Sequence, residues 1–190
     1  MIRASRSPNC SLLVKQVIVV LLAWSGLSCA MDCETSCRAQ TPDGGRLAGE
    51  GLDALLGEPG ASICLVGNTL AERMQHHVWL ETGLQSRFPD RKMSFRNLGF
   101  SGDELTLRLR SAGFGSSDEH LRRCRADVVW ACFGFNESFA GEAGLAKFEA
   151  DLRDYVRHLQ EQDFSGRGAP RVVLFTPLAV ERLPDDSLPG

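Results

Sequence analysis

Four short apolar runs recur along the chain from residue 61 onward, and longer stretches separate them. The runs do not alternate apolar with polar residues, which is typical of strands covered on both faces of a sheet. Strands that alternate with helices predict a parallel sheet with right-handed crossovers. The predicted strands are residues 62–66, 93–98, 127–133 and 171–175.

Apolar residues three to four positions apart predict the helices between these strands. One helix is expected over 70–88, where Pro89 ends it. The clearest helix covers 142–160, and a short helix covers 117–124.

Residues 103–110 have a mixed pattern. Their leucines alternate with polar residues, as in a strand. Asp103 and Glu104 directly after Gly102 are typical of the start of a helix, whose N-terminus favours acidic side chains. We favour the helix.

The first 30 residues have the features of a secretory signal peptide. Arg3, Arg6 and Lys15 give a positive start, residues 17–27 are apolar but short for a membrane span, and cleavage after Ala30 is expected. This predicts a secreted or periplasmic protein. The alternative is that these residues stay uncleaved and anchor the protein, in which case only they would contact the membrane.

Residues 31–60 are rich in glycine, proline and charge, so we expect a flexible linker with one helical turn around 52–56. The domain then covers 61–190. Its composition is that of an ordinary globular protein, with 43% hydrophobic residues and a net charge of −3, and no basic stripe that would favour nucleic acid.

The seven cysteines do not have the spacing of a disulfide framework or of a zinc site. Two of them, Cys64 and Cys132, lie in apolar runs and are expected as buried thiols. Lipidation of Cys29 is left open. We expect no metal and no cofactor.

Small or polar residues follow three of the predicted strands. They are 67–69, 97–103 and 134–137. Ligands of parallel sheets bind beyond the carboxyl ends of the strands, so we expect these three segments to meet.

The three segments read "GNTL", "NLGFSGDE" and "FGFNE", and this series resembles the SGNH hydrolase superfamily, or GDSL-type esterases and lipases. The resemblance covers about residues 61–180. It implies a three-layer αβα, flavodoxin-like parallel sheet, of which about four strands are present here. It also implies hydrolysis of an ester, with a small-molecule or glycan ester as the partner.

The resemblance places candidate roles on six residues. Thr69 falls on the nucleophilic serine, while the Gly102 amide and the Asn136 side chain fall on oxyanion donors. Such donors stabilise the charge that develops in acyl transfer. The candidate substrate contacts are Asn68, Ser101 and Glu137.

Each role has a structural alternative. Thr69 fits the N-cap of the next helix, with Glu72 completing a capping box. Gly102 would serve as an ordinary turn glycine. Asn136 would form a hydrogen bond that holds its own loop, and Glu137 would cap the next segment.

The chain departs from the family pattern at the catalytic base. Asp-Ser has become Asn68-Thr69, and no Asp-x-x-His segment follows the last predicted strand. His76 and His77 lie about 10 Å along their helix from Thr69. His120 and His158 are expected at the surface. We expect either a fragment of a longer protein or a loss of the triad.

Two functions from different classes therefore stay open. The first is an exported SGNH-like ester hydrolase, and the alternative is a non-catalytic binding module or part of a larger exported protein. A nucleotide binder ranks below both, because the first turn offers one glycine in place of Gly-x-Gly-x-x-Gly.

Overall fold

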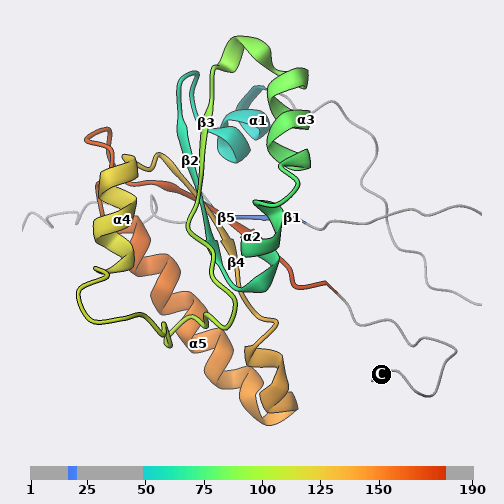
Figure 1. The fold of residues 1–190 in the computed structure, drawn as a ribbon, viewed down its shortest axis with the longest axis vertical. Coiled ribbons are helices and arrows are strands. Elements are labelled where there is room, and N and C mark those ends of the chain that lie inside the picture. The colour runs from blue at the N-terminus through green and yellow to red at the C-terminus, as the bar shows by residue number, and fades with distance from the viewer. Residues whose placement is uncertain (1–16, 21–48, 179–190) are drawn as a thin grey trace, which may run out of the picture.

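The computed structural model describes residues 17–20 and 49–178 of the chain. These residues form a five-stranded, all-parallel sheet with the order β1-β5-β4-β2-β3 (Figure 1). The strands are β1 Val17–Val20, β2 Ser62–Gly67, β3 Ser94–Asn97, β4 Val128–Cys132 and β5 Arg171–Phe175. The four strands predicted from the sequence are confirmed.

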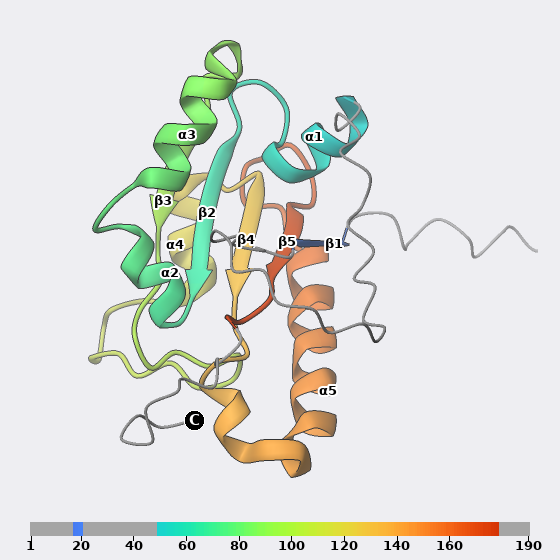
Figure 2. The same ribbon diagram turned by 90° about the vertical axis from the view of Figure 1, so that its right-hand side faces the viewer.

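Helices cover both faces of this sheet, which confirms the three-layer αβα, flavodoxin-like fold (Figure 2). The helices are α1 Gly49–Leu56, α2 Thr69–Met74, α3 Trp79–Arg87, α4 Ser117–Cys124 and α5 Gly141–Gln160, with short 3-10 turns at Pro89–Arg91 and Glu137–Ala140.

Each strand sends alternate side chains to opposite faces. On one face, Ile63, Leu65 and Trp130 pack under α1, α2 and α3. The Trp130 indole N–H also donates to the Leu55 carbonyl at 3.0 Å, which ties α1 to the sheet. On the other face, Cys64 and its neighbours pack under α4 and α5. Both faces are buried, so the strands need no polar alternation.

The single helix expected over 70–88 is wrong, because the chain forms α2 and α3 with a break between them. At the break Val78 adopts a left-handed conformation with φ of 46°. Leu80, Leu84 and Phe88 form a stripe that is out of phase with the stripe of α2. The break lets both stripes pack on the same core.

The helix expected over 103–110 is also wrong, because this segment is irregular. Tertiary contacts engage a backbone N–H and the acidic side chain that would otherwise start the helix. The Leu105 N–H donates to Glu137 Oε1 at 2.9 Å, and the buried Asp103 carboxylate pairs with Arg110. Asp103 therefore anchors a loop and does not start a helix.

The packed region begins before the boundary expected at residue 61. Helix α1 lies in the stretch expected as a linker, and its Leu56 is fully buried. Strand β1 lies in the stretch expected as a signal peptide and pairs in parallel with β5. The rest of the expected leader, and residues 31–48 of the linker, fall outside the described residues. None of the described helices is long and apolar enough to cross a membrane.

Candidate functional site

The chain order reverses at the centre of the sheet, between β2 and β4. From β2 the chain passes to β3 on one side and then to β4 on the other. Crevices at such a switch point are where open parallel sheets bind ligands. The loops after β2, β3 and β4 all leave the sheet at the carboxyl ends of the strands, on the side where this crevice lies (Figure 2).

Backbone hydrogen bonds hold these three loops together. The Asn68 N–H donates to the Cys132 carbonyl at 3.1 Å, and the Phe100 N–H donates to the Gly67 carbonyl at 2.9 Å. Gly67 has φ of 135°, and a Cβ there would lie 2.1 Å from the Cys132 carbonyl oxygen. Only glycine permits this approach of β2 to β4.

An apolar cavity of about 270 Å³ opens at the ends of β2, β4 and β5, and we call it the strand-end cavity. Its size is close to the lower end of typical ligand pockets, about 300–1,000 Å³. Its lining consists of Asn68, Thr69, Leu70, Arg73, Cys132, Phe133, Phe135, Phe175, Pro177 and Leu178.

Asn68 caps α2, and this corrects the capping box expected for Thr69. The Asn68 Oδ1 accepts the Leu70 N–H at 3.3 Å. The Asn68 Nδ2 is buried and has no hydrogen-bond partner among the described residues. A buried amide donor without a partner is costly.

Thr69 is the first residue of α2 and lines the strand-end cavity, half-buried. Glu72, expected to complete its capping box, is bonded elsewhere, because its carboxylate accepts the Ser101 hydroxyl. This contact joins α2 to the loop after β3. Ser101 is exposed and does not line the strand-end cavity.

Gly102 and Asn136 lie on loops that are bonded to each other. The Asn136 Nδ2 donates to the backbone carbonyl of Asp103 at 3.0 Å, one residue after Gly102. Gly102 has φ of 88° in an exposed turn, with open space around it. Neither residue is part of the lining that contains Thr69.

Glu137 holds the loop after β4. Its Oε2 accepts the Gly134 N–H, and its Oε1 accepts the Leu105 N–H, both at 2.9 Å. Both carboxylate oxygens are therefore engaged with backbone. This geometry favours the structural alternative for Glu137 over contact with substrate.

Among the described residues, no histidine or carboxylate lines the strand-end cavity. His158 pairs with Asp118 at 2.9 Å on α4 and α5, and His120 contacts the Phe114 carbonyl. Cys132 does line the cavity. Burial raises the pKa of its thiol to about 12, so it stays protonated and is a poor nucleophile at neutral pH.

Among the described residues, no group of three or more histidine, cysteine, aspartate or glutamate side chains is placed to hold a metal ion.

The sequence reasoning missed an ion cluster beside this site. The Asp103 carboxylate is fully buried, accepts two N–H groups from Arg110 at 2.7 and 2.8 Å, and lies 3.7 Å from Arg108. The sequence signal was present in the alternation of Leu107-Arg108-Leu109-Arg110, which puts both arginines on one side of an extended segment.

Comparison with known proteins adds little to this geometry. No protein family and no curated protein matches the chain. Among solved structures, the chain is similar to one described as "BT4096 a gut microbial diltiazem-metabolizing enzyme", with 16% identity and a TM-score of 0.43. The match covers 62% of this chain and 27% of that one, so the chain spans about a quarter of the length of the structure it matches.

Proposed function

We propose that this chain provides the ester-binding part of an SGNH-like hydrolase site. The acyl group of an ester, from a small molecule or an acylated glycan, would enter the strand-end cavity. The Thr69 hydroxyl would then attack the carbonyl carbon, its proton would pass to the departing alcohol as the ester C–O bond breaks, and water would release the acid from the acyl-threonine. One observation carries this proposal, namely that an apolar cavity beside Asn68 and Thr69 lies at the switch point of the sheet.

Candidate donors for a developing oxyanion lie on the loops after β2, β3 and β4. The Asn68 Nδ2 has no partner among the described residues. Asn136 uses one of its two amide N–H groups on the Asp103 carbonyl, so the other remains for a ligand. The backbone N–H of Gly102 is a third candidate. Each donor of this kind is typically worth about 10²–10³ in rate.

Binding without turnover is the second candidate function. A threonine hydroxyl needs a base to become a nucleophile. The ionisable residues that line the strand-end cavity in the described part of the chain are Arg73 and Cys132, and neither is suited to that role. This observation favours a module that binds apolar ligands or esters.

Hydrolysis of p-nitrophenyl acetate, butyrate and octanoate tests the first proposal. We expect Thr69→Val to abolish turnover, since it keeps the branched shape and removes the hydroxyl. Thr69→Ser should retain or raise it, and Asn136→Ala should lower it by about 10²-fold. Thr82→Val, on the exposed part of α3, is the matched control.

Titration with nonan-2-one, which resembles an ester but cannot be hydrolysed, tests binding alone. If the ketone binds but Thr69→Val hydrolyses esters as fast as the wild type, Thr69 is not the nucleophile. If the ketone binds and the wild type does not hydrolyse esters, the binding function replaces the hydrolase. No binding and no turnover would contradict both.

We also propose that the protein is exported. The basic, acid-free start and the apolar stretch over 17–27 support this. Cleavage after Ala30 would remove β1 and leave the edge of β5 unpaired. N-terminal sequencing of the protein recovered outside the producing cell would give residue 31 first. Recovery inside the cell with Met1 retained would contradict export.

A further inference from the structure

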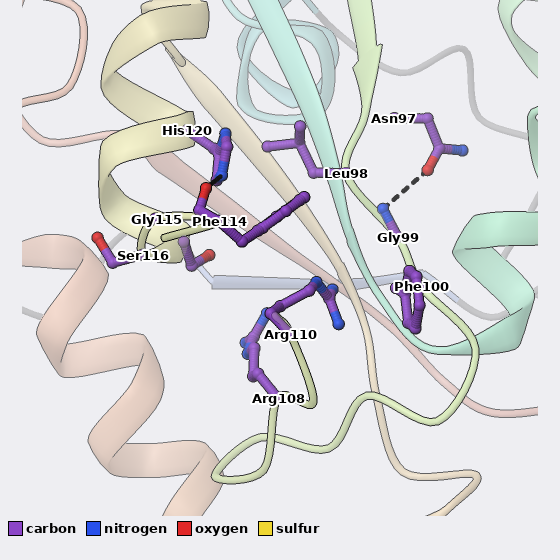
Figure 3. A pocket seen from close by; sticks show the side chains of 11 residues that line it. Asn97, Leu98, Gly99, Phe100, Arg108, Arg110, Phe114, Gly115, Ser116 and His120 are labelled. Carbon is purple, nitrogen blue, oxygen red and sulfur yellow. Dashed lines mark hydrogen bonds between the residues drawn. The ribbon is translucent and has the colours of Figure 1, made fainter. Parts of the chain in front are cut away.

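A second cavity lies at the same edge of the sheet, between the end of β3 and α4, and we call it the arginine cavity (Figure 3). Its volume is about 450 Å³, within the usual range for small-molecule pockets, about 300–1,000 Å³. Figure 3 shows Phe100 on the β3 side and Phe114 and His120 on the α4 side, with Arg108 and Arg110 between them.

Arg108 has unused hydrogen-bonding capacity in this cavity. Its guanidinium carbon lies 5.0 Å from the centre of the Phe133 ring and 5.8 Å from that of Tyr155. These rings hold the group by cation–π attraction. Asp103 forms an ion pair with Arg108 at 3.7 Å, which is beyond hydrogen-bonding distance.

Arg110 is placed differently. It makes a bidentate pair with Asp103, and its guanidinium carbon lies 4.0 Å from the centre of the Phe100 ring and 5.5 Å from that of Phe114. Asp103 faces both arginines with a single negative charge, so one net positive charge remains at the cavity. No carboxylate is part of the lining itself.

The other acidic groups near the cavity are already engaged. The Glu119 carboxylate accepts the Ser116 N–H at 2.7 Å, and Asp118 pairs with His158. Neither residue lines the cavity.

The aromatic walls offer a second type of contact. Phe100 and Phe114 are each 49% exposed although Arg110 packs against both. His120 packs against Phe114 with ring centres 4.8 Å apart, and its Nε2 contacts the Phe114 carbonyl at 2.9 Å. A planar ligand group would find apolar surface here, next to the free donors of Arg108.

We propose that the arginine cavity binds a small ligand that carries a phosphate or carboxylate on a planar or aromatic group. Arg108 bonds the anion through its free N–H groups, and Phe100 and Phe114 contact the planar group. Guanidinium matches both anions because its paired N–H groups fit two oxygens. This site is separate from the strand-end cavity and does not depend on ester hydrolysis.

Calorimetric titration with phenyl phosphate and with benzoate tests the proposal, and the two probes distinguish the phosphate from the carboxylate. We expect at least one to bind, and Arg108→Gln to weaken it by about tenfold or more. Phenol, which keeps the ring without the strong anion, should bind at least about tenfold more weakly. Arg153→Gln on the exposed face of α5 is the matched control.

Three outcomes would overturn the proposal. They are the absence of millimolar binding by both anions, equal binding of phenol, and unchanged binding by Arg108→Gln.

A labelling experiment on the wild-type protein avoids reliance on a variant that fails to fold. Phenylglyoxal modifies accessible arginines, and mass spectrometry locates the product. The anion that binds should slow modification of Arg108 and leave Arg153 unaffected. Equal rates at Arg108 with and without the anion would contradict the site.

Discussion

The two cavities lie at the same edge of one sheet but are built in different ways. The strand-end cavity is walled by residues that directly continue β2, β4 and β5, so the sheet itself places its lining. The arginine cavity is walled by the end of β3, the irregular chain that follows it and the start of α4, and a buried carboxylate, Asp103, fixes the irregular part. The comparison teaches that a sheet pattern can position one site, whereas a single tertiary ion pair positions the other.

The largest expected effect comes from Asp103→Asn, which removes the charge that pairs with Arg110. Breaking a buried pair on one side typically costs about 3–5 kcal/mol of unfolding free energy. Urea unfolding measures the loss. As the urea concentration rises, the arginine cavity of the variant should lose its affinity for anions at a lower concentration than the strand-end cavity loses its affinity for nonan-2-one.

Asp154→Asn is the control for this change, because Asp154 pairs with Arg157 at the surface. Exposed pairs contribute about 0–1 kcal/mol. An Asp103→Asn protein as stable as this control would show that Asp103 does not anchor the loop.

Gly67→Ala tests the other construction. The added Cβ would collide with the Cys132 carbonyl, and φ of 135° is unfavourable for alanine. We expect a loss of about 3 kcal/mol in urea unfolding, with β2 and β4 forced apart under the strand-end cavity. Gly60→Ala shares a positive φ but meets no atom within 4 Å, so it should cost only about 1–2 kcal/mol. Equal losses would mean that backbone strain alone, without the close approach, matters at Gly67.

Two phenylalanine variants, one in each cavity, test whether the two cavities bind their ligands independently. Phe135→Ala should weaken the binding of nonan-2-one by about tenfold, since it removes an aromatic contact surface. Phe114→Ala should weaken the binding of the aromatic anion by a similar factor for the same reason. Each variant should change binding at the other cavity by less than about twofold. Titration of both ligands against both variants gives the answer. Equal effects of one variant on both ligands would show that the cavities are coupled.

The smallest expected effect is a pH dependence of α4, which forms one wall of the arginine cavity. The Ser116 N–H lowers the pKa of Glu119 below its ordinary value. A lowered folded-state pKa stabilises the protein above the unfolded pKa, and this contribution is lost as the pH falls through the folded pKa. Thermal unfolding between pH 6 and pH 3 should therefore be slightly less pH-dependent in Glu119→Gln. Matching curves for wild type and variant would contradict the role of the cap.

The sequence located the strands and the two helices of one layer because their pattern is local. Runs such as 127–133 are apolar on both faces, and the stripe of α5 repeats every three to four residues. It predicted a ligand position at the carboxyl ends of the strands for the same reason, because residues that follow a parallel strand must lie at its carboxyl end.

The errors arose where distant residues compete with local preference. Thr69 and Asn68 are both good N-caps, and the choice fell to Asn68, whose N–H is held by the Cys132 carbonyl of a neighbouring strand. Asp103 has the pattern of a helix start, but its pairing with Arg110 seven residues later holds the segment in an irregular loop.

By itself, the sequence determined the alternation of strands and helices, and hence the parallel sheet and the edge at which a ligand would bind. Only the tertiary structure decided which side chains face each cavity. Hydrophobic periodicity is a property of near neighbours in the chain, whereas a buried charge pairs with a residue that is close in space. The free energy of that pairing exceeds the small local preference for a helix.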